Sequence, residues 1–300
     1  MYLLKKLGIA LLETFSSFKR TRSPKLIMTL LVKNEEDLLE KNLQFHKAMG
    51  IDYFIITDNN STDRTAEIIE KYKQKGWILE CIEEKGTNYA QKVWVDRMVW
   101  MAKTKYKADW IINADADELW YSSTGSLKTE LETTSSNILG CNVVGMYPDD
   151  TRPIWEWDRI VKPVPSLSEY HLSIYSIFNP QRNKVVHRSN GYIQIAMGNH
   201  KVAMFPRMKE TSSTITIYHY TVRGRKEFID KMVNGGKQLE KNRKKHVGRH
   251  WRYFYGIYKD GKLNEEYDRV VGTDSYDRLY QEGYIQKDTT IPEFFKSNVL

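Results

Sequence analysis

Hydrophobic and polar positions alternate in blocks along the first part of the chain. Runs of strand length that are apolar almost throughout occupy residues 25–32, 53–59, 77–83 and 108–115. Segments with apolar residues at helical spacing lie between them, at residues 35–50, 61–76 and 89–105. Gly50 and Gly76 follow two of these segments and are typical helix stops. Fully apolar strands that alternate with amphipathic helices predict a mostly parallel sheet with helices on both faces.

The pattern changes beyond residue 121. Residues 122–137 are rich in Ser and Thr and indicate a loop or a helix with polar caps. Short strand-like runs follow at residues 138–147, 170–178, 183–188 and 215–222. From Arg223 onward the chain is polar, helical in pattern and aromatic toward its end. We therefore expect the α/β class, with a parallel sheet, a mixed β region and a helical C-terminal tail.

Polar side chains follow three of the predicted strands at the points where the strands end. They are Asn34-Glu35, Asp58-Asn59-Asn60, and the acids of IINADADELWY, namely Asp115, Asp117 and Glu118. Ligands of parallel α/β sheets bind outside the carboxyl ends of the strands, so we expect these groups to face one crevice. Two carboxylates one residue apart offer the oxygen ligands that Mg²⁺ or Mn²⁺ prefers, with positions left for a diphosphate. This placement predicts a metal site, which an isolated Asp-x-Asp would not.

The net charge of +8 is concentrated in two segments. Residues 1–25 carry six Lys/Arg and one acid, and residues 223–252 carry eleven Lys/Arg and three acids. These segments contribute +5 and +8, so the remainder of the chain sums to −5. The uneven distribution argues against a nucleic-acid-binding core and for attraction to an anionic surface or substrate. For residues 223–252, a solvated helix, an anionic acceptor and the inner membrane leaflet all remain open as explanations.

Residues 1–20 place leucines at helical spacing among basic residues. The longest apolar stretch, Leu7 to Leu12, is too short to span a bilayer. The segment fits an amphipathic helix lying on a membrane, and it fits equally well a helix that packs on its own domain. Cys81 and Cys141 have no CxxC neighbour, so we expect buried thiols in a reducing cytoplasm and no structural zinc. The chain has no GxGxxG, GxxxxGK[ST], HExxH or GxSxG pattern.

The residues at the strand ends resemble a known family. VKNEEDLLEKNLQFHKAMGIDYFIITDNNSTDRT, followed by WIINADADELW, is similar to family-2 glycosyltransferases of GT-A fold. The similarity is greatest to a bacterial subgroup with NE, H-x-x-x-G, DN-x-S-x-D-x-T and D-x-D-E motifs, and family-92 enzymes look related in the same stretch. It covers residues 26–121 well and extends more loosely to about 235. We accordingly divide the chain into segment 1–25, a catalytic domain 26–222 with halves 26–121 and 122–222, and an extension 223–300.

The resemblance implies roles for residues of the first half. Asn34 and Glu35 would lie near the nucleotide base, and Asp58 would bind the uracil or ribose. Asp63 would hold that loop or only cap the next helix, and Lys92 would approach the nucleotide sugar unless it is simply solvated. Gln91 and Arg97 are weaker candidates of the same kind. Asp115 would contact the ribose or the metal and Asp117 the metal, while Glu118 would brace the loop.

Candidates beyond residue 121 are fewer. GT-A enzymes often take a further metal or diphosphate ligand from a later histidine, for which His200 and His219 are the candidates. Lys184 and Arg188 would steady the diphosphate. An inverting enzyme also needs a general base beside the acceptor hydroxyl, and the usual Glu-Asp pair is missing. Asp149 and Asp150 are the substitutes that we expect, ahead of Glu156 and Asp158.

The leading hypothesis is a metal-dependent, inverting glycosyltransferase that uses Mn²⁺ or Mg²⁺. Its donor would be a nucleoside-diphosphate sugar, UDP-linked in the first instance, and its acceptor a glycan or lipid-linked chain of a bacterial surface polysaccharide. We expect it in the cytoplasm, with contact to the inner membrane as an option, and we expect no nucleic-acid partner. One alternative is a non-catalytic sugar- or surface-binding protein on a GT-A scaffold. A second is an aspartyl-phosphate phosphotransferase, although its Asp-x-Asp would follow the first strand rather than the fourth.

Overall fold

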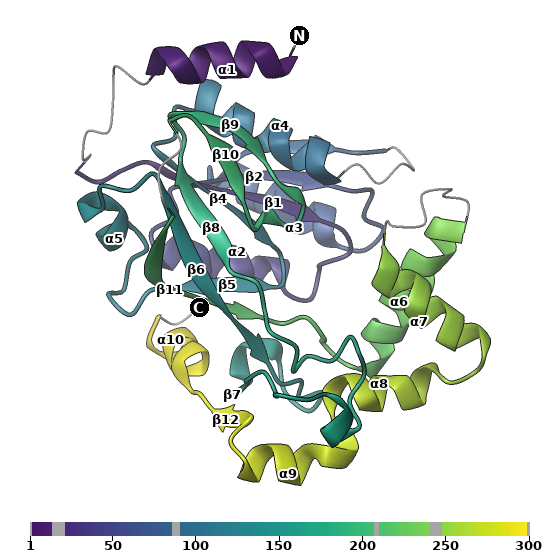
Figure 1. The fold of residues 1–300 in the computed structure, drawn as a ribbon. Helices are drawn as coiled ribbons and strands as arrows, with labels where there is room; N and C mark the ends of the chain where they lie inside the picture. Colours follow the sequence, from purple (N-terminus) through teal and green to yellow (C-terminus); the bar gives the residue numbers. More distant parts are fainter. Residues whose placement is uncertain (1, 14–21, 86–90, 207–209, 241–247, 299–300) are drawn as a thin grey trace. The chain divides into compact units, whose positions relative to one another are not determined.

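The computed structural model describes all residues except 1, 14–21, 86–90, 207–209, 241–247 and 299–300. The described chain forms two compact units (Figure 1). The first unit comprises residues 1–143 and 182–218 together with residue 300, and the second comprises residues 144–181 and 219–299. The domain boundaries that we predicted from the sequence are not tested by this division and stay predictions.

A parallel sheet forms the centre of the first unit. Its strands run in the order β3-β2-β1-β4, and their bounds are β1 Leu26–Val32, β2 Tyr53–Asp58, β3 Ile78–Glu83 and β4 Trp110–Asp115. The helices that connect them are α2 Leu39–Ala48, α3 Thr65–Gln74 and α4 Gln91–Thr104. Because β1, β2 and β4 are apolar along their length, almost all of their residues are buried. The predicted α/β class with a mostly parallel sheet is therefore confirmed.

Antiparallel strands extend this sheet. Strand β8 (Lys184–Arg188) pairs with β4, and β6 (Ile138–Met146) pairs with β8 through its first residues. Strand β11 (Thr211–His219) pairs with β5 (Glu118–Tyr121) and β6. The remaining elements of the first unit are α1 Tyr2–Glu13, α5 Lys128–Thr133, β9 Tyr192–Ile195, the 3-10 turn η3 Met197–Asn199 and β10 Val202–Met204.

The second unit is built mainly of helices around its own apolar core. Its helices are α6 Arg225–Glu240, α7 Arg249–Lys259, α8 Leu263–Val271, α9 Tyr276–Gln281 and α10 Thr290–Asn298. Its short elements are η1 Ile154–Glu156, β7 Arg159–Val161, η2 Ser168–Tyr170, η4 Thr273–Ser275 and β12 Ile285–Lys287. Strand β7 pairs antiparallel with β12 and with the last residues of β6. Phe178, Phe228, Phe254 and Tyr267 lie in the core. The predicted helical tail is confirmed.

Two element predictions differ from the structure. The helix predicted over residues 35–50 begins only at Leu39, and the preceding amides of Glu35 and Glu36 donate to the side chains of Thr65 and Asp63. The strand predicted over residues 170–178 is wrong. His171 adopts a left-handed φ of 54°, and the amides of Ser173 and Ile177 donate to carbonyls near the end of α8.

Candidate functional site

Three strand ends of the first unit meet at one edge of the sheet. Val32 at the end of β1 lies opposite Asp58 of β2, and Leu31 lies opposite Asp115 of β4. Since neighbouring strands lie about 4.8 Å apart, the backbones of Asp58 and Asp115 are about 10 Å apart on either side of β1. The ends of β1, β2 and β4 therefore lie side by side, and the shared ligand-binding crevice stays a prediction.

The acidic turn, which we define as residues 115–118, joins β4 to β5. Ala114 and Ala116 are buried, whereas Asp115 and Asp117 are half-buried, so the two acids are the partly open groups of the turn. Glu118 is fully buried, and its carboxylate accepts hydrogen bonds from the Asp115 amide (3.2 Å) and the Trp120 indole N–H (3.3 Å). Glu118 thus braces the turn from inside, which is the role predicted for it.

Lys184 of β8 provides the cation inside this turn. Its Nζ lies 2.6 Å from Oδ2 of Asp115 and also forms an ion pair with the Glu118 carboxylate. The Lys184 side chain is only 4% exposed, so its ammonium group lies away from bulk water. Burial alone lowers the pKa of Lys184, but the charges of Glu118 and Asp115 outweigh it and raise the pKa above its ordinary value. One buried ammonium therefore offsets the repulsion between two adjacent carboxylates.

Helix α2 holds the backbone of the acidic turn. The buried Asn42 amide donates to the carbonyls of Ala116 (2.8 Å) and Glu118 (2.9 Å). His46, one helical turn later, accepts the Trp120 amide at Nε2 (3.0 Å) and therefore carries its proton on Nδ1, which lies 2.9 Å from the Asn42 carbonyl. Burial lowers the pKa of His46 to about 3, so the ring stays neutral and keeps this tautomer. Neither residue was predicted as part of the site, although His46 begins the H-x-x-x-G motif.

Hydrogen bonds between two loops fix the ends of β1 and β2. Asn34, in a left-handed conformation with φ 54°, accepts the Thr62 amide (2.8 Å), and its own amide donates to the Ser61 hydroxyl (3.0 Å). The buried carboxylate of Asp58 accepts the amide and hydroxyl of Ser61 at 3.0 and 2.6 Å. Asn34 and Asp58, both predicted nucleotide-binding residues, are thus brought together through Ser61.

Asp63 and Glu35 lie in the same pair of loops. Asp63 accepts the amides of Thr65 (3.0 Å) and Glu36 (3.1 Å), and the Glu35 amide donates to the Thr65 hydroxyl (2.8 Å). Partial burial raises the pKa of the Asp63 carboxyl, but the hydrogen bonds from Thr65 and Glu36 outweigh it and lower the pKa below its usual value. Asp63 is therefore an anion that orders the start of α3 and ties it to the loop after β1.

Lys92 and Arg188 are two further cations that were predicted to contact the donor. Lys92 is exposed near the start of α4. Arg188 lies over the Trp110 ring at 4.6 Å and donates to the carbonyls of Ser136 (3.3 Å) and Thr134 (3.1 Å). The structure therefore gives Arg188 a packing role in β8, and it gives Lys184, rather than Arg188, the contact to the acidic turn.

The two candidate histidines belong to different units. His200 follows η3 in the first unit, and its Nδ1 lies 3.0 Å from the Asn183 carbonyl. Since a carbonyl only accepts, Nδ1 carries the proton and Nε2 is left with the lone pair that a metal ligand needs. Asn183 precedes Lys184, whose ammonium contacts Asp115, so this contact brings His200 close to the acidic turn. Partial burial lowers the pKa of His200. His219 begins the last part of the second unit, with Nδ1 3.2 Å from the Thr221 hydroxyl.

Asp149 and Asp150 of the second unit have different surroundings. Asp149 accepts the hydroxyl (2.5 Å) and amide (3.1 Å) of Thr151 and the Arg152 guanidinium (2.9 Å). These hydrogen bonds, with that of the Thr151 hydroxyl the largest effect, hold the pKa of Asp149 below its usual value. Asp150 is exposed and faces Gly224, where a Cβ would lie 3.2 Å from its carboxylate. The Asp149 carboxylate is thus hydrogen-bonded within its own loop, and the Asp150 carboxylate is the more accessible of the two.

The carboxylates of the turn suit a divalent cation that shares a diphosphate. Among the residues that the structure describes, no three His, Cys, Asp or Glu side chains converge as a complete metal cage. Mg²⁺ commonly binds through one or two carboxylates together with substrate phosphates, so a complete protein cage is not required. Asp115, whose side chain is 36% exposed, and Asp117 supply such oxygens, with His200 nearby. The donor set therefore fits a metal that a bound diphosphate completes.

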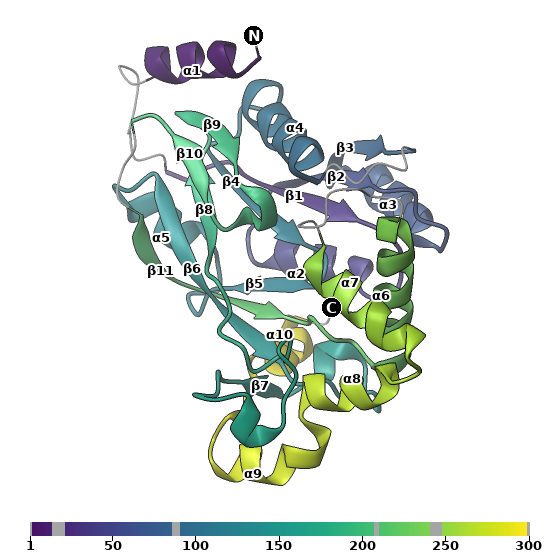
Figure 2. The same ribbon diagram turned by 45° about the vertical axis from the view of Figure 1, so that its right-hand side comes forward.

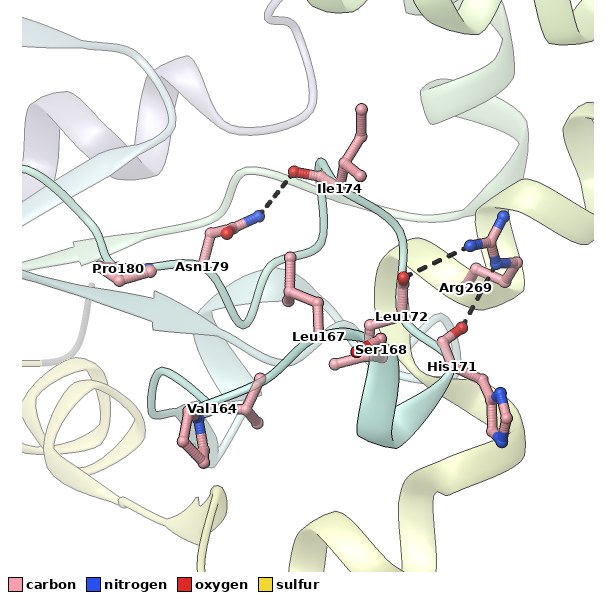
Figure 3. Close-up of a pocket in the computed structure, with 10 residues that line it drawn as sticks. Val164, Leu167, Ser168, His171, Leu172, Ile174, Asn179, Pro180 and Arg269 are labelled. Carbon is pink, nitrogen blue, oxygen red and sulfur yellow. Dashed lines mark hydrogen bonds between the residues drawn. The ribbon is translucent and has the colours of Figure 1, made fainter.

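A separate pocket lies in the second unit. It has a volume of about 760 Å³, and Figure 3 shows its lining residues. Arg269 donates to the carbonyls of His171 and Leu172 at its margin, and the Asn179 amide donates to the Ile174 carbonyl. None of the predicted site residues lines this pocket, so it adds nothing to the acidic turn.

Comparisons with known proteins identify the family of the chain. The model of glycosyltransferase family 92 matches residues 29–250. The lipopolysaccharide core biosynthesis glycosyltransferase LpsC of Rhizobium meliloti (strain 1021) is 30% identical over 123 residues. The match covers 40% of this chain and 42% of LpsC, so the chain spans less than half the length of that curated relative.

Two solved structures are similar at low sequence identity. TarS 1-349 of S. aureus is 12% identical, with 86% of this chain and 75% of that chain covered and a TM-score of 0.38. The mannosyltransferase PcManGT of Pyrobaculum calidifontis, solved with GDP-Man and Mn²⁺, is 10% identical, with 88% and 77% covered and a TM-score of 0.40. Both TM-scores are below 0.5, so these two structures say nothing about the site of this chain.

Proposed function

Because the chain belongs to glycosyltransferase family 92, we propose that it moves a sugar from a nucleoside-diphosphate sugar to a glycan or lipid-linked acceptor. One observation carries the proposal: the sequence motifs that hold Asn34, Asp58 and Asp115 lie at neighbouring ends of a parallel sheet. That edge is where α/β sheets bind their ligands. We further propose UDP as the nucleotide, with the base and ribose beside Asn34, Glu35 and Asp58.

The proposal includes a divalent metal, Mn²⁺ or Mg²⁺. Asp117 and Asp115 would hold it with the donor diphosphate, and Nε2 of His200 is the better placed of the two histidine candidates. The bound metal would supply charge stabilisation to the diphosphate as it leaves. Lys184 would keep the Asp115 carboxylate fixed at its other side. His219 and Lys92 stay as weaker candidates for contact with the donor.

We propose an inverting reaction with Asp150 as the general base. An exposed carboxylate can accept the proton of an acceptor hydroxyl while that oxygen attacks the anomeric carbon and the nucleoside diphosphate departs. Asp149 is a poorer base, because its hydrogen bonds to Thr151 and Arg152 favour the anion and lower its proton affinity.

The acceptor is proposed to be part of a bacterial surface polysaccharide, anionic in character. The similarity to LpsC and the +8 charge of residues 223–252 support this class of acceptor. We place the reaction in the cytoplasm, with peripheral contact to the inner membrane. Within the part of the chain that the structure describes, no helix has both the length and the apolar character to cross a bilayer.

Binding and transfer assays test the proposal. Purified protein is screened by thermal shift against UDP-, GDP-, CMP- and dTDP-sugars, each with Mn²⁺ and again with EDTA, because a bound ligand must raise Tm by mass action. We expect a shift with one nucleotide class that depends on the metal. Asp117→Asn should abolish the shift and lower the transfer rate at least a hundredfold, whereas the exposed Asp274→Asn should change neither.

The outcomes separate the proposed parts. Full transfer in EDTA would exclude the metal. Asp150→Asn should retain nucleotide binding and lose turnover, and an unimpaired Asp150→Asn would exclude this residue as the base. Affinity for sugar polymers without any nucleotide-dependent shift would instead support the non-catalytic binding protein.

A further inference from the structure

Helix α1 faces the opposite way from an ordinary surface helix. A helix on a globular protein normally buries its apolar face and exposes its polar face. In α1 the buried residues include Lys6 and Ala10, while five leucines are exposed. The exposed fractions are 55% for Leu3, 73% for Leu4, 37% for Leu7, 43% for Leu11 and 76% for Leu12.

Polar contacts attach the inner face of α1 to the first unit. Lys6 donates to Asp96 of α4 (2.5 Å) and lies over the rings of Trp100 (4.8 Å) and Tyr192 (5.4 Å). Glu13 accepts from Lys103 (2.7 Å) and from the Gly191 amide (2.8 Å). Figures 1 and 2 show α1 lying along α4 and β9. Contacts near the middle of the helix and at its C-terminal end fix which face points outward.

The outward face is a continuous apolar strip. At about 100° per residue, Leu3, Leu7 and Leu11 form one line along the helix with Leu4 beside it, and Leu12 lies about 80° further round the helix from Leu4. A twelve-residue helix is about 18 Å long and about 10 Å wide. Contiguous exposed apolar surface of this kind marks an interaction site rather than scattered surface leucines.

The charges around the strip favour an anionic partner. Lys6 and Glu13 neutralise groups within the protein, which leaves Lys5, Lys19, Arg20, Arg22 and Lys25 as the other charged residues of the first 25, all basic. Lys5, Arg22 and Lys25 are exposed in the described part of this segment. A strip of roughly 18 by 10 Å falls well short of the approximately 800 Å² that each partner of a stable protein interface contributes, which disfavours a second copy of the chain. Exposed leucines with Lys5 exposed on the same helix, in a 25-residue segment of net charge +5, match the surface of an anionic bilayer.

We propose that the outward leucine face of α1 seats in the interface of an anionic lipid bilayer while its polar face stays attached to α4 and β9. Such a helix lies in the plane of the interface with its apolar side chains among the acyl chains. The inference rests on the proposed peripheral contact with the inner membrane, and it does not depend on the sugar-transfer reaction.

Flotation of the full chain with vesicles tests the inference. Wild-type protein, Leu4→Ser/Leu12→Ser and Ile174→Ser are mixed with vesicles of phosphatidylglycerol and phosphatidylcholine, and with phosphatidylcholine alone. Leu4 and Leu12 are the most exposed leucines of α1, so the double variant keeps the fold, and Ile174, which is 61% exposed, is the matched aliphatic control. We expect the double variant to bind anionic vesicles at least tenfold more weakly than wild type and Ile174→Ser to bind equally well. Wild type should bind phosphatidylcholine vesicles less well than the anionic ones.

Three results would overturn the inference. They are equal flotation of the double variant, no flotation of wild type with anionic vesicles at low salt, and a wild-type dimer in light scattering that the double substitution dissociates. A nucleotide-dependent thermal shift on the same samples separates the two proposals. A retained shift with no flotation leaves the glycosyltransferase intact, and flotation without any shift leaves the membrane contact intact.

Discussion

At the scale of single residues, Lys184 is the group on which the acidic turn depends. It is buried between Asp115 and the fully buried Glu118, both of which carry negative charge beside it. Desolvation offsets much of the attraction in such a cluster, so the cluster adds little net stability. Removing only the cation is different, because two carboxylates are then left close together without compensation.

Replacing Lys184 by methionine should therefore destabilise the first unit strongly. Methionine keeps the length and volume of the chain but removes the charge, and the expected loss in free energy of unfolding is about 3–5 kcal/mol. Urea denaturation followed by circular dichroism measures it. Lys226→Met is the matched control, since that side chain is 91% exposed on α6 and should lose no measurable stability.

A second substitution tests the cause of the Lys184 effect. Adding Glu118→Gln to Lys184→Met removes one of the two repelling charges and should restore part of the lost stability. If Lys184→Met is as stable as wild type, charge compensation is not the role of Lys184. The same conclusion follows if adding Glu118→Gln lowers the free energy of unfolding of Lys184→Met as much as it lowers that of wild type.

The sequence could locate Asp58 and Asp115 because each directly follows an apolar strand. It could not pair Asp115 with Lys184, which lies 69 residues further along the chain. Asn42 and His46 were missed for the same reason, since their contacts to the acidic turn span 74 to 76 residues. Within helix α2 both occupy buried positions that suit ordinary core residues, and only the fold turns their polar atoms toward the turn.

At the scale of elements, helices α6 and α7 pack closely through two glycines. A Cβ on Gly235 would lie 2.8 Å from the Trp251 ring, and a Cβ on Gly236 would overlap the Tyr255 side chain. The absence of side chains at these positions lets the helix axes approach. In the middle of a helix, glycine otherwise costs stability relative to alanine.

Two glycine-to-alanine substitutions should have opposite effects. Gly236→Ala should destabilise the second unit by about 1–3 kcal/mol, because overpacking against Tyr255 exceeds the gain in helix propensity. Gly256→Ala, in α7, has no atom within 4 Å of the new methyl and should stabilise by about 0.5–1 kcal/mol. Chemical denaturation of both variants beside wild type measures the difference, and effects of the same sign would contradict the packing argument.

Elements were predictable where one local pattern determined them. The four parallel strands and the helices between them were found because each is apolar throughout or apolar on one face. Residues 170–178 misled because their apolar residues face the core of the second unit from turns, with Tyr170, Leu172 and Phe178 buried. A buried segment is apolar whether or not it is a strand. The amides of residues 173 and 177 bind carbonyls of α8 instead of a neighbouring strand, and the sequence gives no sign of these long-range contacts.

At the scale of the whole molecule, the sequence predicted the family and the general type of reaction more specifically than it predicted the substrate. The motif array implied a relation to family 92, which the match over residues 29–250 confirms, whereas membership of family 2 stays a prediction. The sequence also identified the basic segments that carry the net charge. It could not show that α1 turns its leucines outward, because the same amphipathic pattern fits either orientation.

The dependence of stability on pH is also a property of the whole chain. His46 and His187 are fully buried, and burial lowers their pKa values from 6.5 to about 3 and about 4. In the unfolded chain both titrate near 6.5, so between pH 6.5 and 4 the unfolded state binds more protons than the folded state. Stability must therefore fall as the pH is lowered through this window.

The expected fall from pH 7 to pH 5 is about 2 kcal/mol for each of the two histidines. Carboxyls whose pKa values are lowered in the fold, such as Asp63 and Asp149, add to the loss mainly below pH 5, so this window isolates the histidines. His187→Phe tests the assignment, because phenylalanine keeps a ring beside Tyr192 but cannot titrate. Urea denaturation at pH 7, 6 and 5 should show the variant losing about 2 kcal/mol less stability than wild type over the same range. An identical loss in both proteins would mean that His187 is already free to protonate in the folded state, and its burial in β8 would then not control the acid sensitivity of the fold.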